Sequence, residues 1–197
     1  MKKLVFFGDS LTSAGRDESH PTDLGHGFVP KICRELSQDW EAVNCGFNAY
    51  YIVDLIFLLS DPDIKQHIQT ADQLFLLIGI NNIWSDGDEP EEIWETREQR
   101  SVEQFETLLK EIQTLNPQLE IVVGLPFALF DLPIYRDRLP HYQAALQQVA
   151  IHLNHLVIDL TSVLEPLGEE AFTWDNVHLS DLGNHAIAER LIPILGS

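Results

Sequence analysis

Two short segments near opposite ends of the chain carry the residue types of a nucleophilic site. Ser10 lies in the sequence Gly-Asp-Ser-Leu-Thr at positions 8–12, and Asp175 precedes His178 by three positions. A serine hydroxyl is too weak an acid to attack a carbonyl unaided, so it needs a histidine to take its proton and a carboxylate to fix the imidazole tautomer. A fold that joins the two segments would supply all three groups.

Each segment alone also has a structural interpretation. Gly-Asp-Ser is common in turns, where Asp9 would accept backbone N–H groups and Ser10 would only cap a helix. Asp175 could likewise cap the last helix, with His178 as an ordinary surface residue. Their joint occurrence at the ends of expected strands favours catalysis over these alternatives.

Acyl transfer further requires N–H donors for the negative oxygen that develops on the attacked carbonyl. Asn81 and Asn82 follow an apolar run and offer side-chain amides, while residues 44–49 offer backbone N–H groups. The N–H of Ser10 itself would be a third donor. Loop capping is the alternative role for the two asparagines.

The elements that must position these residues follow from an alternation of apolar runs and helical patterns. Several runs are apolar throughout, which indicates strands buried on both faces, and the alternation predicts βαβ units and a five-stranded parallel sheet, hence an α/β fold. No linker divides residues 1–197, so we expect one domain. Ligands bind beyond the carboxyl ends of such strands, where the candidates fall. We expect strands at 3–8, 41–46, 73–79, 120–125 and 155–160, and helices at 29–37, 52–59, 97–115, 135–153 and 181–194.

The composition restricts the partners and the compartment. A formal charge of -19 makes nucleic acid and anionic membrane surfaces poor partners, and favours a small neutral substrate. The acidic stretch 86–106 is either a solvated face or a recognition surface. We find no signal peptide and no membrane-spanning run, so we expect a cytoplasmic protein, with a homo-oligomer left open.

The sequence predicts neither a metal site nor a disulfide scaffold. Cys33 and Cys45 lack C-x-x-C spacing, and we interpret both as small buried hydrophobic residues. Two other sets of potential ligands lack suitable spacing at a sheet edge, and solvated helix positions explain them better. These sets are Asp61, Asp63 and His67, and His152 with His155.

Taken in order, four segments resemble the blocks of the GDSL, or SGNH, hydrolase family. Residues 8–12 resemble its nucleophile motif, residues 44–49 its second block, residues 79–82 its third, and residues 175–178 its terminal Asp-x-x-His. The resemblance implies a flavodoxin-like three-layer α/β/α sandwich and ester hydrolysis without a metal or organic cofactor. It also assigns the catalytic roles to Ser10, Asp175 and His178, and the oxyanion donors to Ser10, Ala49 and Asn81.

Two positions depart from the family pattern. Ala49 stands where glycine is usual, and its methyl group is costly if the backbone there needs a positive φ. Asn82 stands where aspartate is usual, which weakens any charge-assisted hydrogen bond to the neighbouring loop. Neither departure affects the nucleophile or the base.

Further motifs resemble a subgroup that contains carbohydrate acetylesterases, including acetylxylan esterases. They are Gly15-Arg16, residues 24–29, Trp84 and Trp174. Either tryptophan could stack on a sugar ring or simply pack at the rim. Residues 127–130 could form an apolar wall for the acyl group or a buried strand end.

We therefore expect a serine esterase that hydrolyses small acyl esters, acetyl esters above all, of neutral and carbohydrate-like substrates through an acyl-enzyme. A lipase, lysophospholipase or acyl-thioesterase of the same family is one alternative. Another is a catalytically degenerate binding module, motivated by Ala49 and Asn82. A flavodoxin-like phosphate binder using residues 10–15 is a third, but it leaves Asp175 and His178 unexplained.

Overall fold

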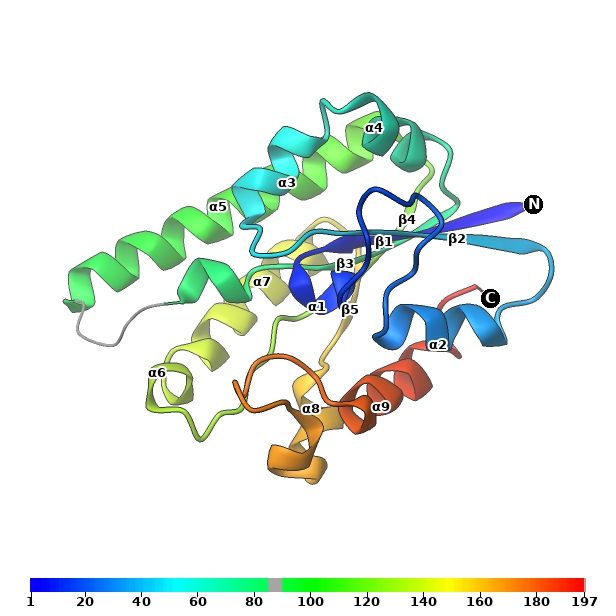
Figure 1. Ribbon diagram of the computed structural model, residues 1–197. Helices are drawn as coiled ribbons and strands as arrows, with labels where there is room; N and C mark the ends of the chain where they lie inside the picture. Colours follow the sequence, from blue (N-terminus) through cyan, green and yellow to red (C-terminus); the bar gives the residue numbers. More distant parts are fainter. Residues whose placement is uncertain (85–89, 197) are drawn as a thin grey trace.

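Five parallel strands form one sheet in the computed structural model, which describes residues 1–84 and 90–196 (Figure 1). The strand order is β2-β1-β3-β4-β5, so β1 is flanked by the two strands that follow it in sequence. The bounds are Lys2–Gly8 for β1, Trp40–Gly46 for β2, Gln73–Leu77 for β3, Glu120–Gly124 for β4 and Leu156–Ile158 for β5. The α/β fold with a five-stranded parallel sheet is thus confirmed.

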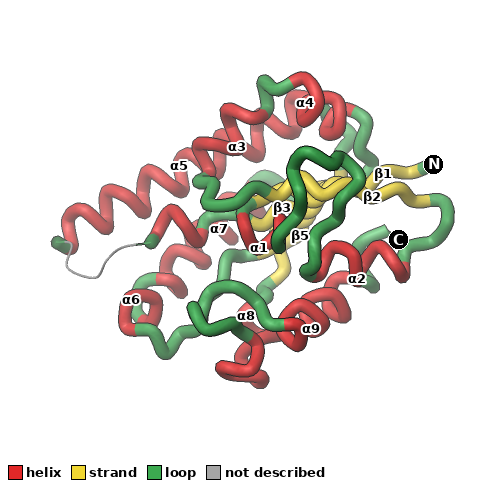
Figure 2. The backbone as a smooth tube through the Cα atoms, in the orientation of Figure 1, coloured by secondary structure: helices red, strands yellow, loops and turns green. Residues whose placement is uncertain are grey.

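Helices cover both faces of the sheet and complete the three layers (Figures 1 and 2). On one face lie α2 (Phe28–Glu35) and α9 (Asp181–Leu191), and on the other α3 (Ile52–Leu58), α5 (Glu91–Leu115) and α7 (Leu139–His152). Among the described residues, none of the helices is both long and apolar enough to cross a bilayer. The shorter elements are α1 (Ser10–Ser13), α4 (Pro62–Gln69), α6 (Pro133–Arg136), α8 (Thr161–Leu164) and two 3-10 helices, η1 (Ile80–Ile83) and η2 (Glu165–Ala171).

The core lies on both sides of the central strands. Residues 4–7 of β1 and 74–77 of β3 are fully buried, as their uninterrupted apolar sequence predicts. Phe6, Phe75 and Phe28 of α2 meet edge to face, with ring centroids 5.9 to 6.2 Å apart. Burial of each such side chain contributes roughly 1.5–3 kcal/mol to the free energy of unfolding. The strands that carry the site are therefore firmly packed.

The observed elements differ from the sequence expectations where proline or glycine changes the backbone. The expected helix 135–153 is two helices, because Pro140 lies in the first turn of α7, where proline starts a helix. The strand expected at 73–79 ends at Leu77, and Gly79, with a φ of 122°, turns the chain into η1. The helix expected to start at 97 starts at Glu91, so residues 91–106 of the acidic stretch lie on α5, whereas 85–89 lie outside the described residues.

Candidate active site

Ser10 is the first residue of α1, immediately beyond the carboxyl end of β1. Asp9 caps this short helix, since its Oδ1 accepts the backbone N–H of Leu11 at 3.0 Å. The helix packs directly on the end of β2, where a Cβ added to Gly46 would lie 2.2 Å from the backbone nitrogen of Ser13. Only glycine fits at position 46. The Asp9 cap and the close contact with the end of β2 together fix the turn that presents Ser10.

Asp175 and His178 reach Ser10 from the loop before α9, which Figure 1 shows in orange next to α1. His178 Nε2 lies 2.9 Å from Ser10 Oγ, and His178 Nδ1 lies 2.6 Å from Asp175 Oδ2. The other carboxylate oxygen of Asp175 accepts the N–H groups of Val177 and His178 and the hydroxyl of Thr173, at 2.9 to 3.0 Å. The structure therefore brings the three residues expected from the sequence into one hydrogen-bonded line.

The charge of Asp175 determines what His178 can do. Burial alone would raise the pKa of Asp175, but the hydrogen bonds from the His178 ring, the two backbone N–H groups and Thr173 outweigh it and lower the pKa to about 2. An ionised carboxylate can only accept, so Nδ1 of His178 carries the proton and Nε2 is left free to take the proton of Ser10.

The expected oxyanion donors follow the two strands that flank β1. Ala49 comes after β2 with a φ of 60°, and Asn81 lies in η1 after β3. One N–H of the Asn81 amide donates to the carbonyl of Tyr50 at 2.9 Å and fixes the side chain, and no described residue accepts from its second N–H. Asn82 Oδ1 accepts the N–H of Ile52 at 3.1 Å. Both asparagines thus fasten the segment that follows Ala49.

Comparison with known proteins identifies the family. The sequence profile of the GDSL-like lipase/acylhydrolase family matches residues 6–186. The chain belongs to this family. It is accordingly a carboxylic ester hydrolase.

Relatives of this GDSL hydrolase match along almost its whole length. An acetylxylan esterase from Geobacillus stearothermophilus is 26% identical, with 99% of this chain and 94% of the relative covered. The crystal structure of Axe2, an acetylxylan esterase from the same organism, superposes with a TM-score of 0.81 at 25% identity, covering 100% of this chain and 94% of Axe2. LAE5, an alpha/beta hydrolase enzyme from the metagenome of Lake Arreo, shares the fold at 20% identity and a TM-score of 0.79, over 98% and 94% of the two chains.

Ala49 occupies a left-handed backbone conformation that favours glycine, as the comparison with the family pattern anticipates. We expect Ala49→Gly to raise the free energy of unfolding by about 1 kcal/mol, because it removes the steric strain of the methyl group. Urea unfolding would measure the change. The matched control is Ala144→Gly on the exposed face of α7, which should lower stability by about 1 kcal/mol. Equal losses in both variants would contradict strain at Ala49.

Asp9 is completely buried beside the nucleophile, and one of its oxygens, Oδ2, has no hydrogen-bond partner in the described part of the chain. Burial raises the pKa of Asp9 to about 7, against smaller opposing effects of the Leu11 N–H and of His178. Below about pH 7 the folded protein therefore favours the protonated carboxyl, and ionisation of the buried group costs stability.

We expect the pH dependence of stability to expose this group. The raised pKa contributes stability that is complete below the unfolded value, near 3.8, and is lost as the pH rises through about 7. The free energy of unfolding of the wild type relative to Asp9→Asn should therefore fall between about pH 4 and pH 8. Asp61→Asn, at the exposed cap of α4, is the control. A difference that stays constant over this range would show that Asp9 does not titrate there.

The two tryptophans proposed to bind a sugar both present their rings to solvent. Trp84, directly after η1, is half-exposed and leans on Tyr135 with ring centroids 6.1 Å apart. Trp174, directly before Asp175, is 93% exposed. Exposure of this kind permits stacking on a ligand, and the role remains a prediction.

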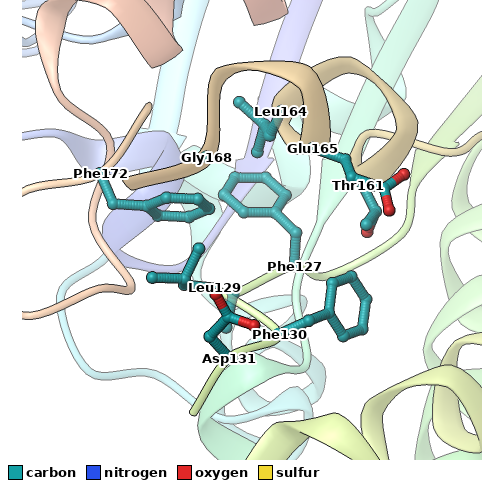
Figure 3. Close-up of a pocket in the computed structure, with 10 residues that line it drawn as sticks. Phe127, Leu129, Phe130, Asp131, Thr161, Leu164, Glu165, Gly168 and Phe172 are labelled. Atoms are coloured by element: carbon teal, nitrogen blue, oxygen red, sulfur yellow. The ribbon is translucent and has the colours of Figure 1, made fainter. Parts of the chain in front are cut away.

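The aromatic segment after β4 lines a hollow of its own. Phe127 faces Phe172 across it, with ring centroids 6.3 Å apart, and Leu129 and Leu164 complete its apolar wall (Figure 3). The hollow encloses about 160 Å³, and the described residues around it do not include Ser10 or His178. Phe127 is buried but lies three residues beyond the end of β4, in the loop and not in the strand, and this hollow is separate from the nucleophile.

Asp61, Asp63 and His67 line one hollow, and the described residues around it do not include Ser10 or His178. Asp61 Oδ1 caps α4 by accepting the N–H groups of Asp63 and Ile64. Within residues 1–84 and 90–196, no group of three or more histidine, cysteine or acidic side chains could hold a metal ion. Cys45 is buried as expected, whereas Cys33 is only partly covered, and neither forms a disulfide.

Sequence reasoning missed supporting groups of the site. Thr173 orients Asp175 through its hydroxyl, and the Tyr50 carbonyl orients Asn81. Thr173 had only a weak indication in the sequence, namely a hydroxyl residue two positions before Asp175. The Tyr50 carbonyl had none, because a backbone acceptor leaves no trace in the residue type.

Proposed function

We propose that this hydrolase is a serine esterase that removes acetyl groups from carbohydrate esters through a covalent acyl-enzyme. The observation that carries the proposal is the hydrogen-bonded line from Asp175 Oδ2 through the His178 ring to Ser10 Oγ, with contacts of 2.6 and 2.9 Å. This arrangement can transfer a proton from a hydroxyl nucleophile and return it to a leaving group.

The reaction begins when His178 Nε2 takes the proton of Ser10 as Oγ attacks the ester carbonyl. The N–H groups of Ser10 and Ala49 and the free N–H of the Asn81 amide stabilise the resulting oxyanion. His178 then protonates the leaving alcohol and the acetyl group remains on Ser10. Water activated by the same imidazole releases acetate, and ionised Asp175 stabilises the imidazolium in both halves.

The relatives support both the residues and the substrate. Axe2 is named an acetylxylan esterase and an acetyl-xylooligosaccharide esterase. Its catalytic mutants carry alanine in place of a serine, an aspartate and a histidine, and the last two lie three positions apart in Axe2, as Asp175 and His178 do here.

Hydrolysis rates on p-nitrophenyl esters from acetate to decanoate, measured beside an acetylated xylo-oligosaccharide, test the proposal. We expect kcat/KM to be highest for acetate, to fall by at least about tenfold by octanoate, and to be substantial for the acetylated sugar. Rapid turnover confined to long chains would indicate a lipase. Specific sugar binding without turnover would indicate a degenerate binding module.

A further inference from the structure

Arg16 connects the segment that carries the nucleophile to the segment that carries an oxyanion donor. Its backbone lies just beyond α1, where its N–H donates to the carbonyl of Ser13 at 3.0 Å. Its guanidinium reaches the end of β2, where Nη2 donates to the carbonyl of Gly46 at 3.2 Å. The side chain therefore joins the element of Ser10 to the turn that contains Ala49.

The guanidinium is buried without an acidic partner. Arg16 is only 9% exposed, and its Nε has no hydrogen-bond partner in the described chain. It lines a hollow together with Glu18, Asp61 and Asp63, but none of the ion pairs among the described residues includes it. The described residues around this hollow do not include Ser10. Neither an ion pair nor contact with the nucleophile explains the arginine at this position.

The guanidinium instead contacts a pair of stacked rings. Its Cζ lies over the ring of Phe47, 5.3 Å from the centroid. Phe47 in turn stacks on Tyr50, with centroids 5.1 Å apart and an angle of 22° between the ring planes. A cation over an aromatic face and a stacked pair of rings are both attractive arrangements. The two rings flank the exposed residues Asn48 and Ala49, so the stack closes the turn that contains them.

Two oxyanion donors depend on the position of this turn. Ala49 has a φ of 60°, a conformation that alanine adopts only where its surroundings hold it there. The carbonyl of Tyr50 accepts one N–H of the Asn81 amide at 2.9 Å, so a displaced Tyr50 would also release Asn81. Loss of the ring stack would therefore misdirect both donors.

These contacts assign Arg16 a part in catalysis that needs no contact with the substrate. We infer that Arg16 is a positioning residue of the oxyanion site, which through the stacked rings keeps the N–H of Ala49 and the amide of Asn81 directed at the developing oxyanion. Donors of this kind stabilise the transition state only when they are held in place before the charge forms. The inference rests on the proposed function and deepens it.

The test measures transition-state stabilisation, with p-nitrophenyl acetate as substrate and 1,1,1-trifluoroacetone as inhibitor. Ser10 Oγ adds to the carbonyl carbon of this ketone, its proton passes to His178, and the former carbonyl oxygen becomes an oxyanion. We expect Arg16→Gln to lower kcat/KM about thirtyfold, mainly through kcat, and to raise the Ki of the ketone by a similar factor. Active sites are counted by fluorophosphonate labelling, so that a loss of folded protein is not mistaken for a loss of kcat.

Further variants check the path through the rings. Phe47→Leu removes the ring between Arg16 and Tyr50 and should show the same two effects. Because Phe47 is only half-buried, this variant remains informative where Arg16→Gln fails to fold. The double variant should lose little more than the larger single loss, since both changes break one path. Arg34→Gln is the control and should alter neither value, because Arg34 Nε also donates to a backbone carbonyl, that of Pro30 at 3.1 Å, but on the exposed face of α2.

The outcomes separate this inference from the proposed function. A loss of kcat/KM matched by a rise in Ki, in either single variant, would support the positioning role. If the wild type is active and both values are unchanged in both variants, the role of Arg16 is overturned and the proposed function stands. A loss of kcat/KM with an unchanged Ki would show a purely structural contribution and would also overturn it. Absence of both turnover and labelling in the wild type would overturn the proposed function and this inference with it.

Discussion

Ser10→Ala is expected to lower kcat for p-nitrophenyl acetate by at least about 10⁴-fold and to abolish labelling by a fluorophosphonate. Ser10 Oγ is the atom 2.9 Å from His178 Nε2, so its removal leaves His178 without the hydroxyl that it deprotonates. The oxyanion donors and the binding groups remain, which is why a small residual rate over the uncatalysed reaction is expected.

The matched control for this variant is Ser13→Ala. Ser13 ends the same short helix, and its buried hydroxyl has no hydrogen-bond partner within the described residues. Ser13→Ala should keep both turnover and labelling. Wild-type turnover in Ser10→Ala would show that the acyl-enzyme mechanism is wrong.

Asp175→Asn is expected to lower kcat by about 10⁴-fold while leaving the fold intact. The asparagine Oδ1 can still accept the hydroxyl of Thr173 and the N–H groups of Val177 and His178. Its NH₂ group, however, would face His178 Nδ1 and force the proton onto Nε2, so the imidazole could no longer accept the proton of Ser10. The defect should therefore appear in kcat with little change in KM.

Acid unfolding gives an independent measurement on the same variant. The pKa of Asp175 is lowered to about 2, so its contribution to stability is complete above the usual value of 3.8 and is lost as the pH falls toward 2. The difference in unfolding free energy between wild type and Asp175→Asn should shrink over that interval. Asp159→Asn is the control, because Asp159 Oδ1 also accepts a backbone N–H but bonds to no histidine among the described residues. If Asp159→Asn lowered kcat as much as Asp175→Asn does, the role of Asp175 in orienting His178 would be wrong.

The framework of the sheet was predictable because strands buried on both faces are continuously apolar. β1 and β2 extend one residue beyond the expected start, at Lys2 and Trp40, and β4 ends one residue early. The short elements were not predictable from periodicity, since the four residues of α1 do not complete a repeat. α4 did have a signal, Asp61 followed by Pro62, a cap and a first-turn proline that sequence reasoning overlooked.

The site was predictable in its residues and less so in its surroundings. Ser10, Asp175 and His178 follow from residue type, spacing and strand-end placement together. The left-handed backbone of Ala49 could be anticipated only from the family pattern, because alanine itself gives no sign of a positive φ.

The order of the groups along the chain has a consequence for synthesis on the ribosome. Ser10, Ala49 and Asn81 follow β1, β2 and β3, three adjacent strands encoded in the first half of the sequence. The base and its carboxylate come from the loop before α9, close to the end. Because domains are made from the N-terminus onward, the nascent chain holds a nucleophile and its oxyanion donors long before it holds a base. A product lacking residues 173–197 would carry Ser10 without its base, so hydrolysis cannot start before the loop that precedes α9 has been made.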